Sequence, residues 1–545
     1  MRIVVAEALN MAFKFVMPLC TEENRTAIEQ CLLSIAGISS FNRSSEMYPQ
    51  VSYSQIQNRL ARINEKESIR KSKGVYYTPT DVVKFIVVNS MKSSFGQLTP
   101  DNISSQDIVP EMIDDYCLQK TVFEPTCGAG EFLLEALEQK ISLWNQVYTA
   151  ATKPQVEKII GTLYGNDINT DSVIITKLRL FLCAVQRFGT ECCLDLPIIL
   201  NHNFTTCDYV VSPPLAEKRY DIIVGNPPYV EDSKSGLKLR EHYGNIYANV
   251  LINAARHLKE GGSMGFIIPI SYTSTPRMKK LRDELLKIVP EQYALCYADR
   301  PDCLFDSVHQ KLCILICCNT GESARIYTGH YQYWYQEERD QLFSNTRVVR
   351  NNCIREDCIP KLGTPRDLSV YQKIMKPTNP TVFSTSRVGS FSVYVNRRET
   401  FWIKAFRQEI IHPEFKVFSY QSKAAADYCY CLVNSSLFWW YWISVSDCWH
   451  VSRDLNGFRA PQISNNSIFS ELADALDAKL ETTKKYVGTK QTEYEYKHRL
   501  CIEEIHAIDD AINSVFGLTQ EESDYIKGFA LRYRVSGGAV TNDCD

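Results

Sequence analysis

The sequence predicts an α/β fold: a sheet with helices on both faces, followed by a C-terminal α+β region and a helical tail. Short apolar runs rich in β-branched and aromatic residues alternate with helical stretches between about residues 120 and 320. This alternation is typical of a parallel sheet with crossover helices. Residues 1–70 are mainly helical in pattern, and residues 463–545 combine helical periodicity with charge. The runs expected to be strands are 121–123, 162–164, 220–224, 264–269, 293–297 and 312–317.

Composition and charge limit the classes of function. Of the 545 residues, 45% are hydrophobic and 23% are charged, which is typical of a globular protein with sizeable cores. The formal net charge is −3, so any surface for nucleic acid must be local. Glu7, Asn10 and Lys14 interrupt the apolar start of the chain, which excludes a signal peptide or membrane span there. We expect a cytoplasmic protein whose 20 cysteines are reduced core residues, because no paired zinc-site spacing is present.

A glycine-containing loop follows the first expected strand. Its sequence is Glu124-Pro125-Thr126-Cys127-Gly128-Ala129-Gly130. Glycines between a strand and a helix allow a ligand to approach the backbone closely. The phosphate-loop pattern G-x-x-x-x-G-K-[ST] is absent, and Glu124 would repel a phosphate but suits an ammonium group. Taken alone, the loop is compatible with a structural turn or with several nucleotide-like ligands.

An acidic residue, Asp167, ends the second expected strand. A carboxylate at the tip of this strand can accept both ribose hydroxyls of an adenosyl group. Asp is also common as a helix N-cap, so the residue by itself does not decide between the two roles. Combined with the loop at Gly128 and Gly130, the ribose interpretation is favoured.

The most specific motif is Asn226-Pro227-Pro228-Tyr229, directly after the run 220–224. Two consecutive prolines fix the backbone and lack N–H donors. The Asn226 side chain and the Pro227 carbonyl can accept the hydrogens of a ring-conjugated amine and stabilise the positive charge that grows when it is alkylated. Tyr229 offers a face on which a planar substrate can stack. These four residues are therefore the predicted catalytic residues.

These motifs resemble those of the gamma-class amino-group DNA methyltransferases, the adenine-N6 enzymes of type I and type IIG restriction-modification systems. The resemblance runs in order over roughly residues 70–320: 73–79 is similar to motif X, 124–130 to motif I, Asp167 to the motif II acid, Asp208 to motif III and, more loosely, Leu304-Phe305 to motif VIII. It implies a Rossmann-like class I methyltransferase sheet, S-adenosylmethionine as cofactor, no metal, and methyl transfer to N6 of a flipped adenine in double-stranded DNA.

The resemblance also implies roles for individual residues. Asn226 lies beside the cofactor as well as the substrate. Tyr229 and Phe305 would hold the flipped base, with plain core packing as the alternative for Phe305. The expected cofactor-binding residues are Tyr77, Thr78, Pro79, Glu124, Pro125, Thr126, Cys127, Gly128, Gly130, Asp167, Ile168, Asp208 and Asn226.

A basic segment follows the expected catalytic region, where the gamma-class order places target recognition. Residues 346–407 contain twelve Lys or Arg and four Asp or Glu, a local charge of +8. Aromatic residues interleave with the cations, a mixture suited to phosphate and base contacts. The alternative is a basic face packed against an acidic partner subunit. The expected DNA contacts are Arg397, Arg398, Lys404 and Arg407, among Tyr394, Trp402 and Phe406.

The expected organisation is an N-terminal helical segment (1–70), a catalytic region (71–320), a recognition region (321–462) and a C-terminal helical region (463–545). The recognition region is shorter than many, which leaves open a separate specificity, nuclease or other defence-system subunit; no membrane partner is expected. Methylation of rRNA or of a protein glutamine is one alternative function. A DNA-binding subunit of a defence complex with lapsed catalysis is another. The segment 76–79 and the basic region favour DNA, and the intact motif at 226–229 favours catalysis.

Overall fold

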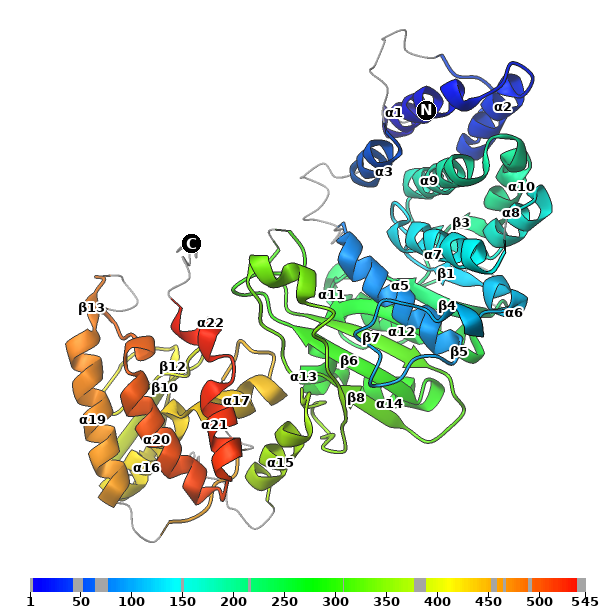
Figure 1. Ribbon diagram of the computed structural model, residues 1–545. Helices are drawn as coiled ribbons and strands as arrows, with labels where there is room; N and C mark the ends of the chain where they lie inside the picture. Colours follow the sequence, from blue (N-terminus) through cyan, green and yellow to red (C-terminus); the bar gives the residue numbers. More distant parts are fainter. Residues whose placement is uncertain are drawn as a thin grey trace.

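The computed structural model describes residues 3–42, 52–63, 77–148, 151–213, 217–306, 308–376, 389–451, 458–463, 467–488 and 493–536. Figure 1 shows N-terminal helices in blue, a central region on a large sheet, and a C-terminal region in yellow to red. Residues 73–76, part of the motif expected ahead of the sheet, lie outside the described residues. The expected region boundaries stay predictions.

A nine-stranded sheet with the strand order β3-β2-β1-β4-β5-β7-β6-β8-β9 forms the centre of the molecule (Figure 1). β1 pairs in parallel with both β2 and β4. Later strands are added outward from β1 and β4 in opposite directions, which creates a topological switch point where α/β proteins bind ligands. The strands are β1 (Val122–Glu124), β2 (Leu163–Asp167), β3 (Phe204–Thr206), β4 (Tyr220–Gly225), β5 (Leu258–Pro269), β6 (Glu291–Tyr297), β7 (Leu312–Cys318), β8 (Arg325–Thr328) and β9 (Val349–Arg350).

Each of the six runs expected to be strands lies in or overlaps a strand, namely β1, β2, β4, β5, β6 and β7. The direction of β7 differs from the parallel arrangement that the sequence predicted, because β7 runs antiparallel to both β5 and β6. The described residues between β6 and β7 contain no helix. Without a crossover helix, the chain returns beside the preceding strand in the opposite direction.

Helices cover both faces of the sheet. α7 connects β1 to β2 on one side of the switch point, and α12 connects β4 to β5 on the other. Because crossover connections are right-handed, connections that leave the switch point in opposite directions place their helices on opposite faces. The predicted α/β fold is therefore confirmed. The main helices of this region are α5 (Thr80–Ser94), α7 (Glu131–Val147), α9 (Thr170–Phe188), α12 (Ile246–Arg256) and α14 (Lys279–Ile288).

The N-terminal helices pack against α9 (Figure 1). Asn24 Nδ2 donates a hydrogen bond to Thr190 Oγ1 at 2.8 Å, and Gln57 Nε2 donates to the Arg179 carbonyl at 3.0 Å. These buried bonds connect the segment to the central region. The three helices are α1 (Ile3–Val16), α2 (Arg25–Ala36) and α3 (Tyr53–Arg62).

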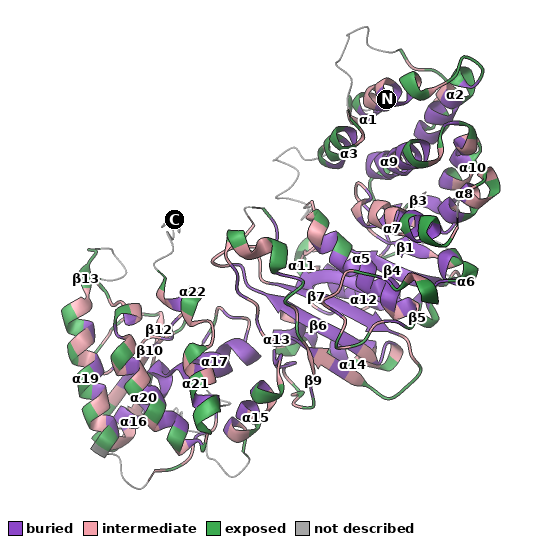
Figure 2. Cartoon of the chain, in the orientation of Figure 1, coloured by how far each residue is buried: buried purple, intermediate pink, exposed green. Residues whose placement is uncertain are grey.

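The C-terminal region is α+β, as predicted. An antiparallel sheet with the order β11-β10-β12 packs against helices. α17, which contains five consecutive aromatic residues at 438–442, is buried along its whole length (Figure 2). None of the described helices combines the length and apolar character needed to cross a membrane. The elements are β10 (Phe391–Asn396), β11 (Ala405–Phe406), β12 (Phe415–Tyr420), α16 (Lys423–Asn434), α17 (Ser436–Val445), α19 (Ser467–Thr483), α20 (Ile502–Val515), α21 (Gln520–Gly528) and α22 (Leu531–Val535).

Candidate active site

The loop after β1 is held by α9. Gly128 and Gly130 have φ values of 49° and 82°, which favour glycine. A Cβ atom on Gly130 would lie 2.5 Å from Thr176 Cγ2, so glycine is also required by close packing. Thr176 Oγ1 donates to the Gly128 carbonyl at 2.9 Å, and Arg179 donates to the Ala129 carbonyl at 2.7 Å. The loop therefore has a defined shape at the switch point of the sheet.

Asp167 joins the ends of β1 and β2. Its Oδ2 accepts a hydrogen bond from the Gly128 amide at 2.9 Å, and its Oδ1 accepts one from the Asn169 amide at 2.8 Å. The carboxylate thus shapes the loop and the start of α9 in addition to any ligand contact. The adjacent Ile168 side chain is 70% exposed, which leaves an apolar surface for a planar ring beside the carboxylate.

Glu124 lies at the end of β1 and is only 2% exposed. Its Oε2 has no hydrogen-bond partner among the described residues. Burial raises the pKa of Glu124 well above its usual value, and the nearby Glu131 and Asp167 raise it further. A buried carboxylate of this kind is costly unless a cation pairs with it. The site therefore fits a ligand that carries an ammonium group, as S-adenosylmethionine does.

Asp208 follows β3 at the same edge of the sheet as Asp167. Its Oδ1 accepts hydrogen bonds from the Val210 amide at 2.9 Å and the Val211 amide at 3.2 Å, so one oxygen stabilises a turn.

Sequence reasoning missed Asn166, which connects the three loops of this edge. Asn166 Nδ2 donates to the carbonyls of Pro125 and Cys207 at 3.1 and 3.0 Å. The signal available in the sequence was its position, beside Asp167 and just after the expected strand 162–164.

Asn226 lies between the first loop and the segment ahead of α5. Its Nδ2 donates to Thr78 Oγ1 at 3.1 Å, and its backbone carbonyl accepts from Thr126 Oγ1 at 3.4 Å. The Asn226 Oδ1 is buried and has no hydrogen-bond partner among the described residues. The structure thus brings together three predicted site residues from separate motifs, with one amide oxygen left to accept hydrogen bonds.

A cavity of about 590 Å³ lies beside this motif, and both Tyr229 and Phe305 line it. The Tyr229 hydroxyl donates to the Ile267 carbonyl at 2.9 Å, and its ring meets Tyr247 edge-on with centroids 6.5 Å apart. These contacts fix the ring. Asp447, just after α17, also lines the cavity, which therefore lies between the large sheet and the C-terminal region. Its volume falls in the usual range for small-ligand pockets.

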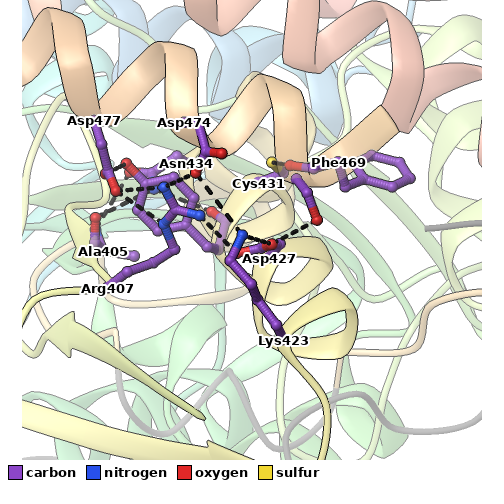
Figure 3. Close-up of polar contacts among 11 residues, drawn as sticks. Ala405, Arg407, Lys423, Asp427, Cys431, Asn434, Phe469, Asp474 and Asp477 are labelled. Atoms are coloured by element: carbon purple, nitrogen blue, oxygen red, sulfur yellow. Dashed lines mark hydrogen bonds and ion pairs between the residues drawn. The ribbon is translucent and has the colours of Figure 1, made fainter. Parts of the chain in front are cut away.

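The basic segment is less available for DNA than its charge suggests. Arg407 contacts Asp427, Asp474 and Asp477 at 2.6–2.7 Å and is 17% exposed (Figure 3). This geometry contradicts the expected phosphate contact of Arg407, because its guanidinium is already paired inside the fold. Trp402 is also buried, and its indole N–H donates to the Arg534 carbonyl at 3.1 Å.

Two other predicted cations have acidic neighbours. Lys404 Nζ lies 3.7 Å from the buried Glu399, and the exposed Arg398 lies 3.3 Å from Glu414. Phe406 packs against Tyr496 and His498 and, unlike Phe305, which is also buried, it does not line the cavity. Like Trp402 it is therefore a core residue rather than a base contact. Arg397 is exposed. Charge counting did not show these pairings because a count does not say which cation an acid such as Glu399 contacts, and Glu414 lies just beyond the counted segment.

Arg397 and Arg398 are nevertheless attached to the edge of the cavity. The Val451 amide donates to the Arg397 carbonyl at 2.9 Å, and Arg398 forms an isolated β-bridge with His450. His450 is adjacent in the chain to the turn at Asp447, whose Oδ1 accepts from the His450 amide at 3.0 Å. The two arginines thus share a local structure with a residue that lines the cavity.

Comparison with known proteins relates the central region to restriction-modification methylases. Residues 161–290 match the family described as Eco57I restriction-modification methylase. The Type II methyltransferase M.VspI of Vibrio sp. (strain 343) is 21% identical over 257 residues, which cover 46% of this chain and 48% of that protein. The modification methylase CviBIII of Paramecium bursaria Chlorella virus NC1A is 24% identical over 217 residues, covering 39% and 45%. The chain thus spans less than half the length of these curated relatives.

The fold is also found in a solved structure, that of the Type IIL restriction-modification enzyme MmeI in complex with DNA. The two chains share 13% identity with a TM-score of 0.50, and the match covers 88% of this chain and 81% of that one. At this identity the likeness concerns the fold alone. The family match over residues 161–290 includes both Asp167 and the motif at 226–229.

Proposed function

We propose that this chain is an S-adenosylmethionine-dependent DNA methyltransferase that modifies the N6 amino group of a flipped adenine. The observation that carries the proposal is the position of Asn226. Its Nδ2 is held by Thr78 next to the loop of β1, which leaves Oδ1 without a partner among the described residues, and the same motif continues into a cavity lined by Tyr229 and Phe305. The Asn226 side chain would thus lie where the site for the methyl donor adjoins the site for a planar substrate.

The residues at the switch point suit each part of the cofactor. Glu124 would pair with the ammonium group, Asp167 would accept hydrogen bonds from the ribose, and Ile168 would contact the adenine ring. Asp208 and the segment at Thr78 would complete the site. When bound, S-adenosylmethionine supplies an electrophilic methyl group on a sulfonium.

The motif at Asn226 would activate the amine without a covalent intermediate. The Asn226 Oδ1 and the Pro227 carbonyl would accept the two amine hydrogens and stabilise the positive charge that develops on nitrogen. Positioning of the amine for direct transfer would provide much of the rate. The described residues form no His, Cys, Asp and Glu cluster that could hold a metal.

Base flipping would be offset by stacking in the cavity. Extrusion of a base costs roughly a few kcal/mol. Stacking on an aromatic ring returns about 1–3 kcal/mol per base. Because the Tyr229 ring is fixed through its hydroxyl, little further ordering is required when the base enters. Arg397 and Arg398 would contact the flanking phosphates of double-stranded DNA, and a further specificity or defence subunit would be a second partner.

The test is methyl transfer from tritiated S-adenosylmethionine to unmethylated plasmid DNA, ribosomal RNA and a protein extract, followed by nucleoside mass spectrometry. We expect N6-methyldeoxyadenosine from DNA, and Asn226→Ala should abolish it while the calorimetric affinity for S-adenosylmethionine stays nearly unchanged. Methylated cytosine, RNA or protein as the main product would contradict the proposal. Substantial residual activity of Asn226→Ala would contradict the role of the amide.

A further inference from the structure

A short 3-10 helix after β8, η5 (Gln336–Gln341), contacts both the start of α5 and the loop that carries Phe305. Its Arg339 forms a two-pronged ion pair with Asp81 in the first turn of α5. Arg339 Nε donates to Asp81 Oδ2 at 2.6 Å, and Arg339 Nη2 donates to Asp81 Oδ1 at 3.1 Å. Such forked pairs fix orientation better than a point charge. Asp81 lies three residues after Thr78, the residue that holds the Asn226 amide.

The same guanidinium also binds the loop that carries Phe305. Arg339 Nη1 donates to the Cys303 carbonyl at 3.4 Å, and Arg339 Nη2 donates to the Leu304 carbonyl at 3.2 Å. These two carbonyls directly precede Phe305, which lines the cavity. One side chain therefore contacts the cofactor-side segment and the base-side loop at once.

The loop needs such support because it lies outside regular secondary structure. Within the loop, Cys303 Sγ donates to the Phe305 carbonyl at 3.0 Å, and two further side-chain contacts lie at the ends of the loop. The Asp299 carbonyl accepts from His309 Nδ1 at 3.0 Å, and Lys311 Nζ donates to Asp299 Oδ2 at 3.3 Å. Arg339 supplies its contacts next to the aromatic residue itself.

We propose that Arg339 is a positioning residue. It holds Phe305 at the wall of the cavity and fixes the position of the Phe305 loop relative to the segment that carries Thr78. The effect on catalysis rests on the proposed function, whereas the effect on the loop does not. Phe305 would form the cavity wall at the distance from Asn226 that a stacked base requires. Displacement of a positioning group by about 1 Å can cost on the order of a hundredfold in rate.

The adjacent Glu338 offers a matched control on the same element. Glu338 caps η5 by accepting from the Tyr335 amide at 2.8 Å, and it binds the C-terminal helix α22 by accepting hydrogen bonds from Arg532 and, at 2.9 Å, from the Tyr533 hydroxyl. Glu338→Gln therefore disturbs η5 without removing a bond to the Phe305 loop. Arg187→Gln is a second control, because it removes an arginine on α9 and its 2.7 Å ion pair with Glu138 on α7.

The experiment compares Arg339→Gln, Arg339→Lys and Asp81→Asn with the two controls in the full chain. Hydrogen exchange followed by mass spectrometry reports on the peptide over residues 299–311. Calorimetry measures S-adenosylmethionine affinity, and steady-state methyl transfer gives kcat and the KM for DNA. We expect Arg339→Gln to speed exchange in that peptide, lower kcat on the order of tenfold or more and leave cofactor affinity within about threefold. Arg339→Lys should recover only part of kcat because lysine lacks the planar fork.

Asp81→Asn should lower kcat in the same way, and the double variant with Arg339→Gln should be little worse than either single one, since both break one network. Unchanged exchange in Arg339→Gln, or equal loosening in Glu338→Gln or Arg187→Gln, would overturn the proposal. A fall in cofactor affinity as large as the fall in kcat would overturn it too. If the wild-type chain does not methylate DNA, the proposed function fails, and the exchange result still decides whether Arg339 positions the loop.

Discussion

Asn226 Nδ2 donates a hydrogen bond to Thr78 Oγ1 at 3.1 Å, which joins the motif after β4 to the segment before α5. Because this bond holds the nitrogen of the Asn226 side chain toward Thr78, the Oδ1 atom points away from Thr78. That oxygen has no hydrogen-bond partner among the described residues. Thr78 thereby determines which atom of the amide is left without a partner. Under the proposed function the amide accepts the hydrogens of an amine and must present oxygen, so the threonine hydroxyl would contribute to catalysis by orienting it.

Thr78→Val keeps the shape of the side chain and removes this acceptor. We expect methyl transfer to fall by about tenfold, because the amide is no longer held with its oxygen toward the amine, a loss of the order of one hydrogen bond or slightly more. Thr78→Ser should retain most activity. Thr80→Val is the control, since Thr80 is exposed at the start of α5. Equal rates for Thr78→Val and Thr80→Val would show that Thr78 does not orient the amide.

Glu124 gives a prediction about pH. Burial raises its pKa in the folded protein well above the usual 4.5, and Glu131 and Asp167 add to the effect. The folded state therefore favours the protonated acid, so this contribution to stability is complete below 4.5 and is lost as pH rises through the folded pKa. Glutamine does not ionise, so the Glu124→Gln variant does not lose this contribution to stability as the pH rises. Without cofactor, we expect the Tm of Glu124→Gln to exceed that of the wild type at about pH 8 and to approach it at about pH 5.

S-adenosylmethionine should reverse this order, because its ammonium group would stabilise the ionised Glu124 of the wild type and not the glutamine. Thermal melts with and without the cofactor at both pH values measure the effect. A Tm difference that is the same at both pH values would indicate that Glu124 does not titrate as its burial implies. Equal cofactor stabilisation of both proteins would exclude Glu124 from the ammonium site.

The sequence predicted the strands of the sheet, and with them the edge at which the proposed cofactor-binding residues lie, because short-range rules decide both. Parallel strands end at one edge, so a motif that directly follows a strand has its place fixed by that strand alone. This holds for Glu124, Asp167 and Asn226. The direction of β7 was predicted wrongly. It depends on whether a helix connects β6 to β7, and the expected strands themselves do not decide this.

The environment of individual cations could not be predicted in the same way. Arg407 lies 20 residues from Asp427 and 70 from Asp477, and Arg339 lies 258 residues from Asp81. Such pairs form only after helices from distant parts of the chain have packed. The number of cations in a basic segment is therefore only the maximum number that can contact DNA, because some of them pair with acids inside the fold.

Arg407 is expected to act in folding. Arg407→Ala removes the guanidinium that contacts Asp427, which is 1% exposed, together with Asp474 and Asp477 (Figure 3). We expect the free energy of unfolding to fall by about 3 kcal/mol, the low end for a broken buried pair, since Lys423 still binds Asp427. Urea denaturation measures it. Arg366→Ala, which breaks the exposed pair with Glu521, should cost under about 1 kcal/mol. Similar losses in both variants would mean that the Arg407 cluster is no more than a surface network.

Arg397 and Arg398 are expected to act in DNA binding instead. Their segment is bonded to the turn that follows Asp447 at the cavity, and both side chains are exposed. Phosphate contacts release counterions, so affinity should fall steeply with salt. Replacing both arginines with Ala should weaken binding to all duplexes and make the slope of log K against log salt shallower by about one to two. Fluorescence anisotropy of a labelled duplex at several salt concentrations measures both quantities.

Arg25→Ala with Arg187→Ala is the matched control, because it removes two charges near α9, away from the cavity. This control should bind DNA like the wild type, and cofactor affinity should be the same in both double variants. If the Arg397 and Arg398 variant keeps the wild-type affinity and slope, the segment does not contact phosphates. Loss of a co-purifying protein from that variant would then assign the segment to a subunit interface. A control that weakens as much would show that the measured effect follows net charge, because two removed charges reduce long-range attraction wherever they lie.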